Sequence, residues 1–247
     1  MNRATTAALS ILALLSLTSL TACGGESGSD ADSAQKPAAT TPAEKQETPE
    51  ERLKQMVITK ADVSGMDVSD ADVATSDASE FAFAKSQREV TVEEPVCAPL
   101  AYAMNQLPLD EPQADVTRSV SKGLNDPFTY VLLATYESGR SEPALTDLSK
   151  AVDACAGGFT AKANGNTSAY DSVTAEEPVA EAGDESVAFR STLTFQGVEH
   201  TVHTQAVRSG EVLAVFFSVD GTAIANARPS DAKLPSAVVK AQNAKLA

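Results

Sequence analysis

Residues 186–219 read SVAFRSTLTFQGVEHTVHTQAVRSGEVLAVFFSV, and this stretch decides the fold. Apolar and polar residues alternate within segments that are separated by glycine-containing turns. This pattern is typical of the strands of a β-meander. It predicts three strands, Ser186 to Phe195, Val198 to Val207 and Glu211 to Val219. Two tight turns, at Gln196-Gly197 and Ser209-Gly210, join them.

The third of these strands is apolar on both faces. Val212, Ala214 and Phe216 share one face, and Leu213, Val215, Phe217 and Val219 share the other. A strand buried on both faces lies in the centre of a sheet or is covered by helices on either side. We therefore expect it to be a central strand.

The chain before and after this stretch adds helices and two more strands. Helices are expected over Glu51 to Val57, Pro95 to Gln106 (inner residues Val96, Leu100, Ala103 and Met104), Ser141 to Ala156 and Pro235 to Lys245, and strands over Ala114 to Lys122 and Phe128 to Glu137. Ser141 is expected to cap its helix, and Gly157-Gly158 to end it. Residues 66–77 are expected to be irregular. The predicted class is α+β, with an antiparallel sheet flanked by helices in a single domain.

Composition limits the partners. The chain has 247 residues, with 19 Lys and Arg against 34 Asp and Glu, a formal net charge of −15. Such a surface repels phosphate backbones, so we expect no nucleic-acid binding. With 43% hydrophobic and 21% charged residues, the chain has the composition of a globular protein.

The N-terminus has the features of a secretory signal. Arg3 precedes a charge-free apolar stretch from Ala7 to Leu20, which is short and rich in Ser and Thr for a membrane span. The stretch ends in Leu-Thr-Ala-Cys at residues 20–23, which looks like a bacterial lipobox. We expect cleavage before Cys23 and lipidation of its thiol; each buried methylene contributes about 0.8 kcal/mol, so two acyl chains anchor stably. An ordinary signal with a chance cysteine is the alternative.

Residues 24–50 contain no Val, Ile, Leu, Phe, Tyr or Met. Such a segment buries too little apolar surface to offset its ordering entropy, so we expect a disordered tether. The expected organisation is a signal peptide at 1–22, lipidated Cys23 with a linker at 23–50, and a folded domain at 51–247. The domain would then lie at the outer face of the bacterial cytoplasmic membrane, attached through Cys23.

Cys97 and Cys155 are the two remaining cysteines. An even pair outside the cytoplasm favours a disulfide, here between the start of one predicted helix and the end of another. Two unpaired buried thiols are an alternative. A redox-active pair is a further one, although it lacks a C-x-x-C spacing.

The two histidines, His200 and His203, are the obvious candidates for metal or base chemistry. On a strand, residues three apart point to opposite faces, so these two do not bind one metal together; Glu199 shares a side with His203 but completes only a weak site. Asp70 and Asp72 have a D-x-D spacing without the glycine and glutamate of a calcium loop. We therefore expect no metal and no cofactor.

No catalytic motif is present. The chain has no G-x-S-x-G, G-x-x-x-x-G-K, G-x-G-x-x-G or H-E-x-x-H pattern, and its carboxylates are scattered. We therefore expect a binding protein rather than an enzyme, with a hydrolase of unrecognised type as an alternative.

The lipobox, the tether, Pro95-Val96-Cys97, Asp153-Ala154-Cys155 and the strand that follows Arg208 together resemble a known family. They are similar to actinobacterial lipoproteins with the extracellular sensor domain of PknH-type mycobacterial Ser/Thr kinases. The resemblance implies an antiparallel sheet flanked by helices, and a cleft for an unidentified ligand. Members commonly have two disulfides, whereas this chain can form one besides Cys23.

These observations give three function hypotheses. The first is a monomeric, non-enzymatic sensor-like module that binds a small molecule, lipid or envelope partner. The second is an envelope lipid carrier with an apolar cavity, and the third is the hydrolase. We expect the recognition surface where the sheet edges meet the helices joined by Cys97 and Cys155, with a neutral, cationic or apolar ligand because the chain is acidic.

Overall fold

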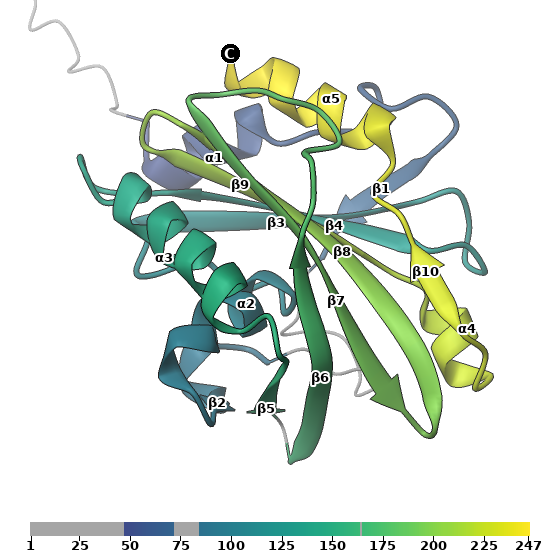
Figure 1. Cartoon of the computed structure of the whole chain (residues 1–247). Coiled ribbons are helices and arrows are strands. Elements are labelled where there is room, and N and C mark those ends of the chain that lie inside the picture. The colour runs from purple at the N-terminus through teal and green to yellow at the C-terminus, as the bar shows by residue number, and fades with distance from the viewer. Residues whose placement is uncertain (1–46, 72–83, 164) are drawn as a thin grey trace, which may run out of the picture. The chain divides into compact units, whose positions relative to one another are not determined.

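The structure is a computed structural model that describes residues 47–71, 84–163 and 165–247. In these residues, ten strands form one sheet in the order β1-β3-β4-β9-β8-β7-β6-β5-β2, with β10 beside β8 (Figure 1). The elements are α1 (Pro49–Met56), β1 (Asp67–Asp70), the 3-10 helix η1 (Gln87–Glu89), β2 (Val90–Val92), the 3-10 helix η2 (Pro95–Cys97), α2 (Ala98–Ala103), β3 (Ala114–Ser121), β4 (Phe128–Thr135), α3 (Ser141–Ala154), β5 (Phe159–Ala163), β6 (Asn166–Ala175), β7 (Glu185–Phe195), β8 (Val198–Ser209), β9 (Val212–Val219), α4 (Gly221–Ala225), β10 (Ser230–Ala232) and α5 (Ser236–Leu246).

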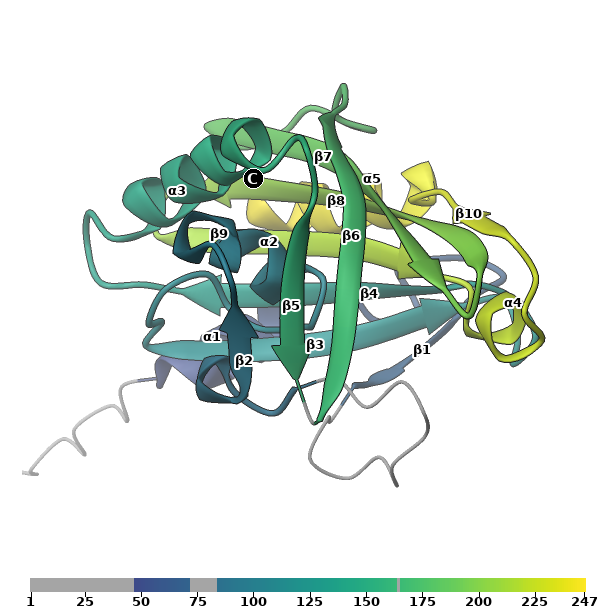
Figure 2. The same cartoon turned by 60° about the horizontal axis from the view of Figure 1, so that its bottom comes forward.

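The β9 strand lies between β4 and β8, as its two apolar faces predict. Leu213 and Val215 belong to a core shared with α2 and α3, whereas Ala214 and Phe216 belong to a core shared with α1 and α5. Helices therefore cover both faces of the sheet (Figures 1 and 2). The predicted class, an α+β domain with an antiparallel sheet and flanking helices, is confirmed.

The β10 strand is parallel to β8, whereas the other strand pairs are antiparallel. The pairing of β9 with β8 ends at Ser218 opposite His203. Beyond that point β10 pairs with β8 from His200 to Val202. After β9 ends, the chain turns back through α4, and β10 then pairs with the part of β8 that β9 leaves unpaired.

The turn at Gln196-Gly197 is confirmed, because both residues have positive φ, 51° and 78°, as a type I′ hairpin turn requires. The second turn is one residue later than predicted, at Gly210 and Glu211. The expected irregular segment at 66–77 is wrong in part, since Asp67–Asp70 form the edge strand β1 against β3. Asp70 forms an ion pair with Arg118 there, and Asp72 lies outside the described residues.

Three helix predictions need correction. The first helix begins earlier, at Pro49, because Thr48 and Glu51 form a capping box. The expected helix over 95–106 is a 3-10 turn followed by the short α2, and Val96 is 49% exposed rather than an inner residue. Ser141 does not cap α3, because Arg140 is the N-cap and the Ser141 hydroxyl donates to the Gly210 carbonyl at 2.7 Å.

The structure joins Cys97 and Cys155 in a disulfide, with the two Cα atoms 6.0 Å apart. Cys97 directly precedes α2 and Cys155 directly follows α3, so the bond links the two helices on one face of the sheet. The signal peptide at 1–22, Cys23 and the linker up to residue 46 lie outside the described residues. In the part of the chain that is described, no helix is long and apolar enough to cross a membrane.

Candidate functional site

A connection between β6 and β7, residues 176–184, crosses the face of the sheet that α5 covers; we call it the strap. Ala180 and Ala182 of the strap pack against the core shared with α5. Backbone hydrogen bonds fix both of its ends. The Glu176 N–H donates to the backbone carbonyl of Ala188 at 2.8 Å, and the Asp184 N–H donates to the backbone carbonyl of Arg208 at 2.7 Å.

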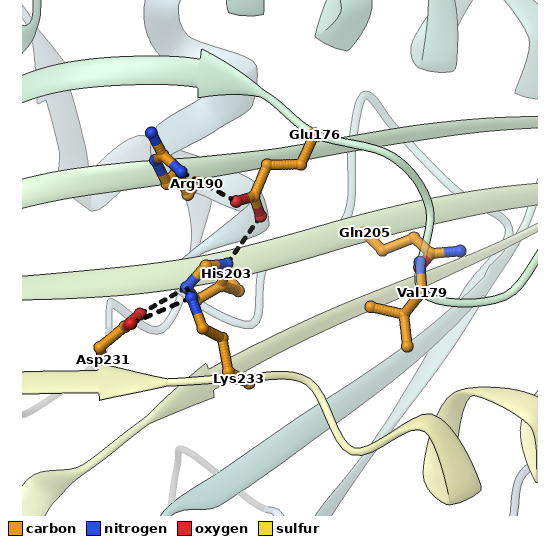
Figure 3. Close-up of polar contacts among 7 residues, drawn as sticks. All are labelled: Glu176, Val179, Arg190, His203, Gln205, Asp231 and Lys233. Carbon is orange, nitrogen blue, oxygen red and sulfur yellow. Dashed lines mark hydrogen bonds and ion pairs between the residues drawn. The ribbon is translucent and has the colours of Figure 1, made fainter.

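Gln205 of β8 holds the middle of the strap. Its side chain is fully buried and accepts a hydrogen bond from the Val179 N–H at 2.9 Å (Figure 3). It also donates a hydrogen bond to the Ala180 carbonyl at 2.8 Å. A buried amide with both ends bonded stabilises one backbone conformation, since any other leaves polar groups without partners. The strap is therefore held in a fixed position above the sheet.

His203 lies two residues before Gln205, on the same face of β8. It is 5% exposed. Its Nδ1 lies 2.7 Å from Oε2 of Glu176 on the strap, and its Nε2 lies 2.6 Å from Oδ1 of Asp231 and 2.9 Å from Nζ of Lys233. Figure 3 shows these groups converging on the imidazole from the strap and from the β10 segment.

The hydrogen bonds of the His203 ring depend on which of its nitrogens carry a proton. With one ring proton, Nδ1 donates to Glu176 and Nε2 accepts from Lys233. With both nitrogens protonated, the ring donates to the carboxylates of Glu176 and Asp231. In either state both ring nitrogens are bonded to protein groups, and none is free to take a proton from a substrate.

The surrounding charges are paired as well. Arg190 of β7 lies 3.3 Å from Oε1 of Glu176, and Lys233 lies 3.0 Å from Oδ2 of Asp231. Burial raises the pKa of Asp231, but the hydrogen bonds and charges of His203 and Lys233 together lower it by more. The pKa of Asp231 therefore lies below its usual value of 3.8. Asp231 is therefore ionised in this cluster near neutral pH.

A cavity of about 310 Å³ opens beside the cluster. It is lined by residues of the strap, of β7 and β8, and of the β10–α5 connection: Glu176, Glu177, Val179, Ala188, His203, Thr204, Lys233 and Leu234. Ligand sites in proteins occupy about 300 to 1,000 Å³ and combine apolar walls with a few polar groups. We take this cavity and the His203 cluster as the candidate site.

The cavity lies away from the expected recognition surface. Val187 and Val202 pack against the core with α2 and α3, so their neighbours Ala188 and His203 point to the opposite face. The cavity is therefore on the α5 side of the sheet, whereas the Cys97–Cys155 bond is on the other. The expectation that the helices joined by the disulfide form the recognition site receives no support from this cavity.

The two histidines do not come together. His200 points to the face opposite His203, where its Nδ1 lies 2.8 Å from the Ser230 hydroxyl. It is 1% exposed, and burial lowers its pKa below 6.5. Glu199, the expected companion of His203, is not among its hydrogen-bond partners. Among the described residues, no group of three or more His, Cys, Asp or Glu side chains is placed to hold a metal.

Sequence reasoning missed the partners of His203. Glu176, Asp231 and Lys233 lie 27 to 30 residues away from it, in segments without periodicity. Gln205 was also missed, because one glutamine in a predicted strand carries no sign of its role. A polar residue at an inward-facing strand position was the only local signal.

Comparison with solved structures shows a similarity of fold. No family model matches the chain, and no curated protein matches it. The crystal structure of the extracellular domain of PknH from Mycobacterium tuberculosis is similar over 81% of this chain and 95% of that one, with a TM-score of 0.47 and 13% sequence identity. This is a weak similarity of fold.

Proposed function

We propose that this chain is an envelope lipoprotein whose folded domain binds a small ligand without transforming it. The observation that carries the proposal is the cavity of about 310 Å³ on the α5 face, with a buried imidazole at its edge. The domain would act outside the cytoplasm as a sensor-like binding module.

The walls of the cavity are held in place by hydrogen bonds within the protein. Gln205 fixes the backbone of the strap at Val179 and Ala180, and His203 fixes its first residue, Glu176. A site that is formed before binding loses less conformational entropy when the ligand arrives. The fixed walls thus favour recognition of a ligand of matching shape.

The alternatives have less support at this site. A lipid carrier needs an apolar cavity, but this one is lined by Glu176, Glu177, His203 and Lys233. A hydrolase needs a group that can attack or deprotonate a substrate, but both nitrogens of His203 are engaged by protein side chains. Thr204 follows His203 on the strand, so its hydroxyl points to the other face, where it is buried.

Anchoring through Cys23 is the second part of the proposal, and it rests on the charge-free segment that ends in Leu-Thr-Ala-Cys. Changing Cys23 to Ala should abolish labelling by a radioactive or clickable fatty acid and move the protein from the detergent phase to the aqueous phase. A serine in the linker, Ser27, provides the matched control, since Ser27→Ala should change neither result. Detergent-phase partitioning that survives Cys23→Ala would refute the anchor.

Binding is tested on the chain without its signal peptide, with Cys23 replaced by Ser so that the protein is soluble. A library of small amines, carboxylic acids, alcohols and sugars is screened by NMR for shifts of the strap amides. Ala188 lines the cavity, so Ala188→Leu should fill it and abolish binding. Ala175, exposed at the end of β6, provides the control Ala175→Leu. Equal binding by both variants would refute this cavity as the site.

A further inference from the structure

The cavity contains one carboxylate that the protein itself does not neutralise. Glu176 is bonded to His203 and Arg190, and Lys233 is bonded to His203 and Asp231. Glu177 also lines the cavity and is exposed. Within the described ranges it has no hydrogen-bond or ion-pair partner, so its charge is available to a ligand.

Apart from the imidazole of His203, the ionised side chains around the cavity sum to one negative charge. The carboxylates of Glu176, Glu177 and Asp231 face the cations of Arg190 and Lys233, so one negative charge remains. The net charge of the chain, −15, has the same sign and attracts cations to the surface at low ionic strength. Both the local and the overall field therefore favour a cationic ligand.

An anionic ligand would have to compete with groups already in place. Lys233 is the cation that lines the cavity, and its ammonium is held by Asp231 at 3.0 Å and by His203 at 2.9 Å. An incoming carboxylate would have to replace Asp231 in a cavity that Glu177 also lines. Like charges within one cavity repel each other, which disfavours anions.

The rest of the lining describes the body of the ligand. Val179 of the strap, Ala188 of β7 and Leu234 after β10 provide apolar surface beside the charged groups. The volume of about 310 Å³ is at the lower end of the range for ligand pockets, so a large ligand does not fit completely inside the cavity. The matching ligand has a small apolar body and one charged end.

We propose that this cavity binds a small organic cation, an ammonium or guanidinium group on a compact apolar body, with Glu177 as its counter-ion. The inference rests on the proposed binding function and specifies its ligand class. Because Glu177 is exposed, the ion pair is partly screened, and its loss should weaken binding about fivefold. Binding should also weaken as salt is added.

Three probes of similar shape test the charge preference: phenethylammonium, 2-phenylethanol and 3-phenylpropionate. Each is titrated into the soluble chain with Cys23→Ser, and the dissociation constant is fitted to the NMR shifts of the strap amides. We expect the cation to bind tightest. Glu177→Gln should reduce its affinity about fivefold, and the alcohol should be unaffected.

Glu181 provides the matched control, because it is an exposed glutamate of the same strap that does not line the cavity. Glu181→Gln makes the same change in net charge and should leave the affinity for the cation almost unchanged. Lys233→Gln removes a competing cation beside the cavity and should raise that affinity.

The outcomes separate this inference from the function on which it rests. Equal affinities for the three probes, a preference for the carboxylate, or equal losses in Glu177→Gln and Glu181→Gln would each overturn the cation assignment while leaving a binding cavity. Absence of saturable binding by all three probes and by the wider library would overturn the proposed function itself.

Discussion

Replacing Gln205 with Leu should release the strap while leaving the sheet folded. Leucine approaches the volume of glutamine but has neither the acceptor that binds the Val179 N–H nor the donor that binds the Ala180 carbonyl. The position is fully buried on a central strand, so the apolar side chain itself is tolerated there. The change therefore removes two hydrogen bonds and little else.

The magnitude follows from those two bonds. A hydrogen bond contributes about 1 kcal/mol net to stability, so we expect the free energy of unfolding to fall by about 2 kcal/mol. The strap is partly exposed, so water can reach the backbone of Val179 and Ala180 once the two hydrogen bonds of Gln205 are lost. Hydrogen exchange of the strap amides should accordingly become faster, by up to about thirtyfold for a local opening that is easier by 2 kcal/mol.

Gln242 provides an unusually close control. It is fully buried in α5, accepts from the Ile58 N–H at 2.9 Å and donates to the Met56 carbonyl at 3.0 Å, so it makes the same pair of bonds to a different segment. Gln242→Leu should cost a similar amount in chemical unfolding. Hydrogen exchange should then increase around Met56 and Ile58 and stay unchanged in the strap.

The assay is urea unfolding combined with hydrogen exchange read by mass spectrometry on peptides that cover 176–184. A loss below about 0.5 kcal/mol in Gln205→Leu, or strap exchange equal to that of Gln242→Leu, would refute the reasoning that Gln205 fixes the strap.

Three further predictions concern stability. Replacing Cys97 and Cys155 by Ala together should lower the free energy of unfolding by about 4 kcal/mol in the chain-entropy model, since the bond closes a separation of 58 residues; equal urea midpoints for the two proteins would contradict this. His200 has a lowered pKa in the folded state, so the unfolded chain takes up its proton first as the pH falls below 6.5 and stability is lost; His200→Asn should reduce the loss between pH 7.5 and 5.5 measured by urea unfolding, and an unchanged slope would contradict the assignment. Gly183→Ala should destabilise by more than about 1 kcal/mol, because φ is +65° and a Cβ would lie 2.1 Å from a backbone oxygen; a neutral result in thermal unfolding would show that the strap can shift.

The features that the sequence predicts well are local ones. The Gln196-Gly197 turn needs positive φ at two adjacent residues, and the uninterrupted apolar run of β9 requires burial on both faces. Each of these follows from a few neighbouring residues and from backbone sterics. For the same reason the central strands agree with the predicted ones to within a few residues.

The strands β5, β6 and β10 are not predicted from the sequence. They pair with segments distant in the sequence or contain few apolar residues. The polar and exposed residues of β6 resemble a loop, although Tyr170 stacks on Phe159 of β5 with ring centroids 4.5 Å apart. The dipeptide Asn164-Gly165 between these strands was a usable hairpin signal, and Gly165 has a φ of +77°. For β10 no such signal exists, because it forms only where β9 ends.

The candidate site is a consequence of register, which explains why no local pattern predicts it. Arg190 of β7 and His203 of β8 are direct cross-strand partners on the α5 face, so two groups that can both be cationic lie side by side. Glu176 binds both, and this is possible only when the strap is folded back across the sheet. Docking Glu176 also brings the adjacent Glu177 to the cavity. The contact of Glu176 with Arg190 and His203 is therefore the same contact that places Glu177 at the proposed cation site, so that site exists only when the strap is folded back across the sheet.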